Sequence, residues 1–136
     1  MNIDNIPETI HKNTIAGLIG IEFVEITNDY IIAKMPVDDR TKQPFGLLHG
    51  GASVVLAETV GSTAAFMTIK DPTKQAAVGL EINANHLKSV TSGWVYAKCT
   101  AIHKGRKTQV WDIRITNDAG DLVCISRFTS MIIDIK

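Results

Sequence analysis

The stretch from Thr41 to Ala65 holds the residues best suited to chemistry. It reads TKQPFGLLHGGASVVLAETVGSTAA, so His49 and two glycines come directly before a long apolar run whose single acid is Glu58. A long apolar run without proline favours a helix over a strand. A helix that begins at Gly50 leaves its first backbone N–H groups unpaired, and these groups favour negative charge. A carboxylate on so apolar a helix needs a partner or a pocket.

These groups suit the hydrolysis of an acyl bond. That reaction needs a base or nucleophile, and donors where the carbonyl oxygen becomes negative. Glu58 is the candidate carboxylate, and we expect it to be buried among aliphatic neighbours. The backbone N–H of Gly50 is the candidate oxyanion donor. No G-x-S-x-G motif is present, so a serine nucleophile is not predicted. The spacing alone also fits a structural interpretation, in which Glu58 is a solvated acid in the middle of the helix and Gly50-Gly51 only begins it.

The spacing of these two groups suggests a site built from two chains. Glu58 lies eight residues after Gly50, which displaces it by ~12 Å along a helix at ~1.5 Å per residue. One chain does not easily bring both groups to one carbonyl carbon, whereas two chains with antiparallel helices do. We therefore hypothesise two equivalent sites per dimer, each combining Gly50 of one subunit with Glu58 of the other.

The rest of the chain predicts the elements that position this helix. A hairpin is expected around Asn28-Asp29, and Pro36 indicates that its second strand ends nearby or lies at an edge. Pro7 and Glu8 predict the first turn of a short helix over 5–19. The expected strands are Ile21–Thr27, Tyr30–Val37, Ala76–Leu87, Trp94–His103, Thr108–Thr116 and Leu122–Ile135. This pattern predicts one α+β domain over residues 1–136, with the sheet curled around the helix.

Composition limits the function classes. The chain has 136 residues, with 14 basic and 14 acidic side chains, so it lacks the concentrated positive charge of a nucleic-acid-binding surface. Its two cysteines, Cys99 and Cys124, show no metal-like spacing and are expected to be buried thiols. The N-terminus lacks a signal-peptide pattern, and no segment predicts a membrane span. We expect a cytoplasmic protein, and its open sheet edges favour oligomers.

Three segments resemble a known family: QPFGLLHGGASVVLAE, VGLEINANHLKS (78–89) and GRKTQVWDIRI (105–115). They are similar to the hotdog-fold acyl-CoA thioesterases, in the PaaI-like branch that includes hydroxybenzoyl-CoA and phenylacetate-pathway enzymes. The resemblance covers almost the whole chain. It implies a long central helix wrapped by a curved antiparallel sheet, dimers that pair into tetramers, and sites shared between subunits. Among these proteins the sequence most resembles the 1,4-dihydroxy-2-naphthoyl-CoA hydrolases of menaquinone synthesis and relatives that clear misloaded aryl carrier proteins.

The resemblance also implies catalytic roles for side chains around Gly50 and Glu58. Gln43 would position the thioester and water, and His49 would orient the carbonyl end. Ser62, one helical turn beyond the acid, would position water or the carboxylate. The alternative for His49 is a capping or packing role, which the surrounding motif makes the weaker of the two interpretations. Ser62 fits equally an ordinary helix serine bonded to its own backbone.

Substrate contacts are implied as well. The resemblance places coenzyme A contacts in two basic turns, which we expect at corresponding ends of their strands; solvated basic loops are the alternative. The candidate contacts are His86, Lys88, Ser89, Arg106 and Lys107. An acyl pocket drawn from two subunits would be lined by Phe45, Leu48, Val54, Phe66 and Met67. No metal or redox cofactor is implied, because coenzyme A is part of the substrate.

Three alternatives to an aryl-CoA hydrolase follow from the same residues. A broad-range thioesterase would accept benzoyl, phenylacetyl or medium-chain groups. A hotdog dehydratase would use a histidine acid–base pair, and the spacing from His49 to Glu58 fits hydrolysis better. A non-catalytic acyl-CoA sensor would be expected to lack the acid, and Glu58 is present.

Overall fold

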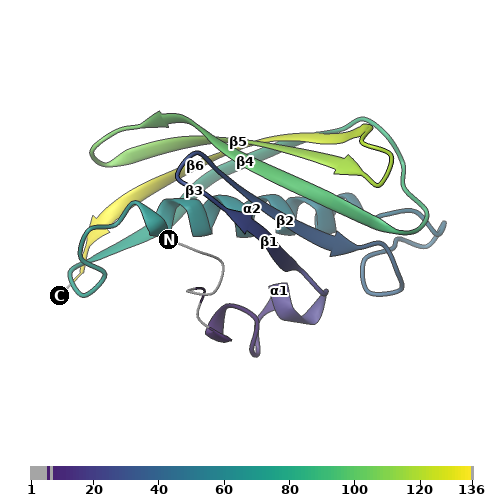
Figure 1. Ribbon diagram of the computed structural model, residues 1–136, viewed down its shortest axis with the longest axis horizontal. Helices are drawn as coiled ribbons and strands as arrows, with labels where there is room; N and C mark the ends of the chain where they lie inside the picture. The colour runs from purple at the N-terminus through teal and green to yellow at the C-terminus, as the bar shows by residue number, and fades with distance from the viewer. Residues whose placement is uncertain (1–5, 7, 136) are drawn as a thin grey trace.

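One long helix, α2 (Gly50–Met67), lies under a six-stranded antiparallel sheet (Figure 1). The computed structural model describes residues 6 and 8–135. The strand order is β1-β2-β4-β5-β6-β3, so β1 and β3 form the two edges. The strands are β1 (Glu22–Ile26), β2 (Tyr30–Pro36), β3 (Gln75–His86), β4 (Trp94–Lys104), β5 (Thr108–Asn117) and β6 (Leu122–Asp134). The predicted hotdog architecture is therefore confirmed, with each strand close to its expected range.

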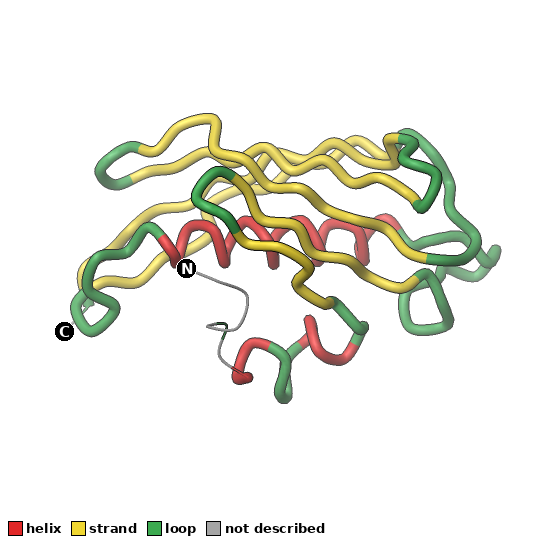
Figure 2. The backbone as a smooth tube through the Cα atoms, viewed as in Figure 1, coloured by secondary structure: helices red, strands yellow, loops and turns green. Residues whose placement is uncertain are grey.

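The core lies between α2 and the concave face of the sheet (Figure 2). The helix buries small and branched residues such as Leu56, Ala57 and Val60, and β6 contributes Phe128, which is 1% exposed. Gly61 permits their close approach, since a Cβ at this position would lie 2.6 Å from the Phe128 ring. The absence of a side chain at this point lets the helix sit directly on the sheet.

The sheet covers only one side of α2. Gly51, Glu58, Ser62 and Phe66 are exposed along the other side. The expectation that the sheet surrounds the helix and buries Glu58 is therefore wrong for a single protomer. The reason is that β3 ends the sheet beside the helix, and no further strand closes over the remaining face.

The N-terminal segment differs from the predicted helix. It contains a 3-10 turn, η2 (Glu8–Ile10), and a separate short helix, α1 (Ile15–Leu18). Asn13 separates the two with a φ of 58°, a left-handed conformation that no α-helix continues through. Pro7, predicted to open the helix, lies outside the described residues. Pro36 is the last residue of β2, so the predicted strand end is confirmed there.

Both cysteines are free and buried, as predicted. Cys99 is 1% exposed on β4, and burial raises the pKa of its thiol to about 12. An unfolded chain loses this proton from about pH 9, well before the folded protein does. The unfolded state then binds fewer protons, so folding stability must fall as the pH rises above that value.

We therefore expect the melting temperature of the protein to fall from pH 9 to pH 11 more steeply than that of Cys99→Val. The valine fills a similar volume and cannot ionise, so other alkaline transitions are common to both proteins. Thermal melts followed by circular dichroism test this. Parallel curves for the two proteins would show that the thiol does not contribute.

Candidate functional site

The loop before α2 is fixed by backbone hydrogen bonds. His49 N–H donates to the carbonyl of Thr41 at 2.8 Å, and Leu48 N–H donates to Val90 at 2.8 Å. His49 is the N-cap of α2, and its Nδ1 accepts a hydrogen bond from Gly51 N–H at 2.8 Å. The capping interpretation of His49 is thus confirmed, and the helix begins at Gly50 as predicted.

Gln43 lies in a tight turn of the same loop. Its backbone N–H donates to Leu47 at 2.8 Å, and its carbonyl accepts from Gly46 at 2.9 Å. Gly46 has a φ of 83°, which a glycine adopts without strain. The side-chain Oε1 of Gln43 accepts a hydrogen bond from Phe45 N–H. The turn therefore holds the amide of Gln43 in one orientation.

A cavity of about 360 Å³ opens where this loop, the start of α2 and the end of β3 meet. Gln43 and Gly50 line it together with residues predicted to contact coenzyme A. Its full lining is Gln43, Leu47, Leu48, Gly50, Ser53, His86, Leu87, Lys88, Ser89 and Val123. Two groups of residues that are distant in sequence thus form one site.

His86 lies directly against Gly50. A Cβ added to Gly50 would lie 2.8 Å from His86 Nε2, so a side chain at this position would displace the exposed imidazole. The Gly50 backbone therefore stays open toward the imidazole and the cavity. Such an arrangement can receive a polar group of a ligand beside the first N–H groups of a helix.

Glu58 and Ser62 lie on the exposed side of α2, one turn apart. The Glu58 carboxylate is close to β3: a Cβ at Gly79 would lie 3.3 Å from Glu58 Oε2. Gly79 also marks a β-bulge with Glu81. We did not identify Gly79 from the sequence, although a glycine inside a strand pattern signals close approach of another group.

Glu58 does not line the Gly50 cavity, so one protomer does not combine the two predicted catalytic groups. Phe45 and Phe66 are 89% and 46% exposed, and Val54 shares the Glu58 side of the helix by its four-residue spacing. Of the predicted acyl-pocket residues, Leu48 alone lines the Gly50 cavity.

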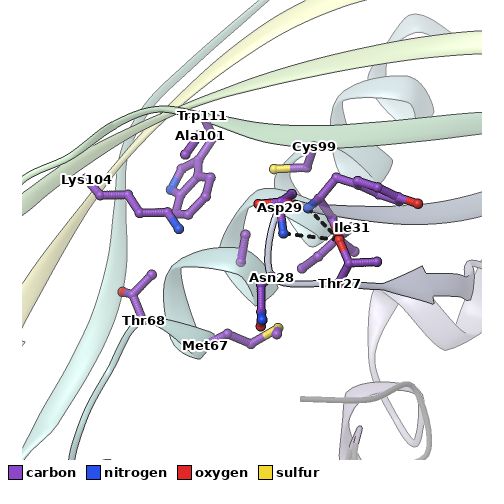
Figure 3. Close-up of a pocket in the computed structure, with 12 residues that line it drawn as sticks. Thr27, Asn28, Asp29, Ile31, Met67, Thr68, Cys99, Ala101, Lys104 and Trp111 are labelled. Carbon is purple, nitrogen blue, oxygen red and sulfur yellow. Dashed lines mark hydrogen bonds between the residues drawn. The ribbon is translucent and has the colours of Figure 1, made fainter.

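Met67 lies apart from the other predicted acyl-pocket residues. It lines a separate cavity of about 370 Å³ between α2, the β1–β2 hairpin and β4, together with Cys99 and Trp111 (Figure 3). Residue 67 is nine positions after Glu58, which is half a turn out of phase on a helix. The structure therefore does not join Met67 to the acyl pocket within one protomer.

The two basic turns lie at opposite ends of the sheet. The β3 end at His86 pairs with Cys124 at the start of β6, whereas the β4 end at Lys104 pairs with Gln109 at the start of β5. The expectation that these turns occupy corresponding ends is wrong, because β3 and β4 run antiparallel within the sheet. Arg106 lines a third cavity, of about 310 Å³, with Lys70 and Lys104. Lys107 is exposed in the same turn.

Lys88 already has an acidic partner. Its Nζ lies 2.8 Å from Asp121 Oδ2, and both side chains are about half exposed (51% and 49%). The hydrogen bond from Lys88 holds the pKa of Asp121 below its ordinary value.

In residues 6 and 8–135 we find no cluster of three metal-ligating side chains. The same residues contain no helix long and apolar enough to cross a membrane.

Comparison with known proteins identifies the class. A family model described as the thioesterase superfamily matches residues 45–124. The chain belongs to this superfamily and has its hotdog fold, and it is a thioester hydrolase. A solved structure of a mutant thioesterase from Pseudomonas aeruginosa superposes with a TM-score of 0.91 at 49% identity, covering 94% of this chain and 91% of that one.

Two relatives carry more specific names. The 1,4-dihydroxy-2-naphthoyl-CoA hydrolase of Escherichia coli is 49% identical over 122 residues, covering 90% of this chain and 88% of the relative. The proofreading thioesterase EntH of Cronobacter turicensis is 45% identical over 119 residues, covering 88% and 85%. Both names describe enzymes that hydrolyse thioesters, but one specifies a particular CoA thioester and the other a proofreading role.

Proposed function

We propose that the protein hydrolyses an aryl-CoA thioester, 1,4-dihydroxy-2-naphthoyl-CoA in menaquinone synthesis, to the free acid and coenzyme A. The observation that carries this proposal is the cavity that joins Gly50 and Gln43 to the turn of His86, Lys88 and Ser89. One end offers donors to a carbonyl oxygen, and the other offers a cation and polar groups to a phosphate. The relative from Escherichia coli supports the choice of acyl group.

The missing carboxylate would come from a second copy of the chain. The exposed side of α2 that carries Glu58 and Phe66 adjoins the edge strand β3, where Leu80 is 52% exposed. An exposed strand edge beside an apolar helix surface is a ready pairing surface. Two copies joined there with antiparallel α2 helices would bring Glu58 of one toward Gly50 of the other. The same pairing would bring the Arg106 end of one sheet toward the Lys88 end of the other.

Hydrolysis would proceed as follows in this shared site. The thioester carbonyl oxygen accepts the hydrogen bond of Gly50 N–H and gains negative charge as the carbon is attacked. Glu58 either attacks that carbon or removes a proton from the water that does. When water attacks, the proton that Glu58 removed from it passes to the sulfur as the C–S bond breaks, and coenzyme A leaves as a thiol beside the free acid. When Glu58 attacks, breaking the C–S bond leaves an acyl anhydride on Glu58, the thiolate takes a proton from solvent, and water then hydrolyses the anhydride to the free acid and the Glu58 carboxylate. Ser62 lies one turn beyond Glu58, where it can orient the water or the carboxylate.

A thiol-release assay tests the function. The panel contains dihydroxynaphthoyl-CoA, benzoyl-CoA, a hydroxyphenylacetyl-CoA, hexanoyl-CoA and an aryl carrier protein loaded with a thioester. A large preference for the naphthoyl thioester is expected. Comparable rates on several CoA thioesters would show that the protein is a broad-range thioesterase and not one specific for the naphthoyl thioester. No release of thiol from any thioester would overturn the proposal.

Proofreading of aryl carrier proteins is the second candidate. It is favoured by the relative from Cronobacter turicensis, which is named a proofreading thioesterase. Phe45 is 89% exposed at the tip of the loop before α2. A carrier protein could dock against its ring. Preferential release from the loaded carrier protein in the same panel would support this candidate over the first.

The ion pair of Lys88 predicts an effect on substrate affinity. Asp121 competes with a substrate phosphate for Lys88, so Asp121→Asn should lower the KM for a CoA thioester without changing kcat. An exposed ion pair is weak, so a change of about two- to three-fold is the expected scale. Steady-state kinetics at low salt measure it. The gain should vanish in Lys88→Ala/Asp121→Asn, and its persistence there would contradict the phosphate role of Lys88.

A further inference from the structure

The Trp111 cavity, bounded by α2, the β1–β2 hairpin and β4, lies apart from the predicted active site (Figure 3). It lies at the end of α2 opposite Gly50 and shares no lining residue with the Gly50 cavity. The space exists because side chains around the Trp111 ring are small: Ala64 on α2, and Cys99 and Ala101 two positions apart on β4. Its volume of about 370 Å³ is sufficient for a small organic molecule.

The walls of this cavity are joined by one chain of hydrogen bonds. Trp111 is 4% exposed, and its Nε1–H donates to Ser130 Oγ at 3.2 Å. Ser130 donates to Gln109 Oε1 at 3.0 Å, and Gln109 Nε2 donates to Thr68 Oγ1, at the end of α2, at 3.0 Å. The chain fixes the indole ring on β5 relative to the end of α2. The walls are therefore in place before a ligand arrives, which lowers the entropic cost of binding.

The charge around the cavity is uneven. Lys104 Nζ lies 5.9 Å from the centre of the Trp111 ring. Within residues 6 and 8–135, Lys104 forms no ion pair. Asp29 lies on the other side of the cavity from Lys104 (Figure 3). Burial raises the pKa of the Cys99 thiol in the inner wall to about 12, so this wall is neutral. The Lys104 end is therefore the positive end of a largely apolar cavity.

We propose that the Trp111 cavity binds an aromatic carboxylate, with the ring of the ligand against Trp111 and Met67 and its carboxylate on Lys104. An indole and a thioether both make favourable contacts with an aromatic ring. A lysine ammonium donates charge-assisted hydrogen bonds to a carboxylate. Asp29 would repel the same carboxylate, so the charges at the two sides select one orientation of the ligand.

This inference goes beyond the proposed function and does not depend on it. The free acid that the proposed reaction releases is itself an aromatic carboxylate. A site of this kind would hold such an acid away from the Gly50 cavity, at the other end of the helix that carries Glu58.

Carbon-13 NMR of the methionine methyl groups reports on the cavity directly. The chain has four methionines, and Met67→Leu identifies the resonance of Met67. Addition of 2-naphthoate should shift this resonance with a Kd on the order of 0.1 mM. 2-Naphthamide has the same rings and no charge, and octanoate has the charge and no ring, so both should bind more weakly. No shift with 2-naphthoate, or equal affinity for either control ligand, would overturn the proposal.

Two substitutions test where the carboxylate lies. Lys104→Gln should weaken the binding of 2-naphthoate about three- to fivefold at low salt, the scale of an exposed ion pair. Arg106→Gln is the matched control, because Arg106 lines only the adjoining cavity that also contains Lys104. It should leave the affinity unchanged. Equal weakening in the two variants, or none in Lys104→Gln, would contradict the proposed contact.

Filling the cavity tests the position of the ring. Ala101 is exposed at the rim, so Ala101→Phe would occupy the space of the ligand without replacing a core side chain. Ile102→Phe is the matched control, since Ile102 is 53% exposed and does not line the cavity. The Met67 shift should disappear in Ala101→Phe and persist in Ile102→Phe, with both variants melting as wild type. A shift that persists in Ala101→Phe would overturn the proposal, and the pair at positions 104 and 106 decides it if this variant does not fold.

Thiol release separates this site from the active site. Ala101→Phe should keep wild-type turnover of the best thioester, because the Trp111 and Gly50 cavities have no residue in common. Lost turnover in a folded Ala101→Phe would make the cavity part of the catalytic site and overturn the proposal of a second site. If the wild type releases no thiol from any thioester, the proposed function fails, and the Met67 shift still decides whether the cavity binds the carboxylate.

Discussion

Glu58→Gln should lose roughly 10³-fold in kcat, the scale expected when a general base is removed. Glutamine keeps the shape of the side chain and removes its negative charge, so neither direct attack nor activation of water remains possible. Glu58 is exposed in the protomer and lies beside the Gly79 backbone, where a neutral amide fits. Folding stability should therefore change by less than ~0.5 kcal/mol.

Steady-state kinetics on the best thioester of the panel, with a thermal melt, measure this effect. Glu25→Gln is the matched control, since Glu25 is an exposed acid on the edge strand β1 whose carboxylate bonds only the Tyr30 hydroxyl among described side chains. It should retain wild-type turnover. Wild-type kcat in Glu58→Gln would remove Glu58 from the mechanism.

Gly50→Val should also abolish most activity, by ~10²-fold or more in kcat/KM. The first carbon of any side chain at this position would lie 2.8 Å from His86 Nε2. Valine would push the imidazole away and fill the cavity in which we place the thioester carbonyl. The expected loss comes from both binding and turnover, because His86 and the Gly50 N–H face the same cavity.

A kinetic titration with substrate, together with the oligomeric mass from light scattering, separates this effect from misfolding. Thr59→Val adds the same side chain elsewhere in α2 and should behave as wild type. If Gly50→Val turns over substrate normally in a correctly assembled protein, the oxyanion donor must lie elsewhere.

Local patterns were sufficient to predict the fold. The run after Gly50 is too long and too uniformly apolar for a strand, and β4 alternates between buried residues such as Val95 and Ala97 and more exposed ones such as Lys98. Such periodicity depends on the chain itself and on which face meets the core. The prediction of one N-terminal helix is wrong for a local reason too. Asn13 adopts a left-handed conformation that the surrounding sequence did not indicate.

The candidate site was only partly predictable. The loop of Gln43, His49 and Gly50 forms a continuous motif, so its residues could be named together. Two features depended on distant contacts that spacing does not encode: the exposure of Glu58 and its approach to Gly79. The placement of Met67 on the other side of α2, by contrast, follows from its nine-residue distance from Glu58 along the helix. The opposite positions of the two basic turns follow from the strand order, which skips from β6 to β3.

The central claim is that each active site combines Gly50 of one subunit with Glu58 of another. Mixing two inactive chains tests it most directly. In a mixed dimer of Glu58→Gln and Gly50→Val subunits, one site receives both intact groups and the other receives neither.

Random pairing makes half of the dimers mixed, with one of two sites intact, so co-expressed chains should recover about one quarter of wild-type activity. Thiol release by the co-expressed pair, compared with each variant alone and with wild type at equal protein concentration, is the measurement. Recovery near one quarter would establish the shared site. No recovery in demonstrably mixed oligomers, separated by two different affinity tags, would contradict it and place both groups in one subunit.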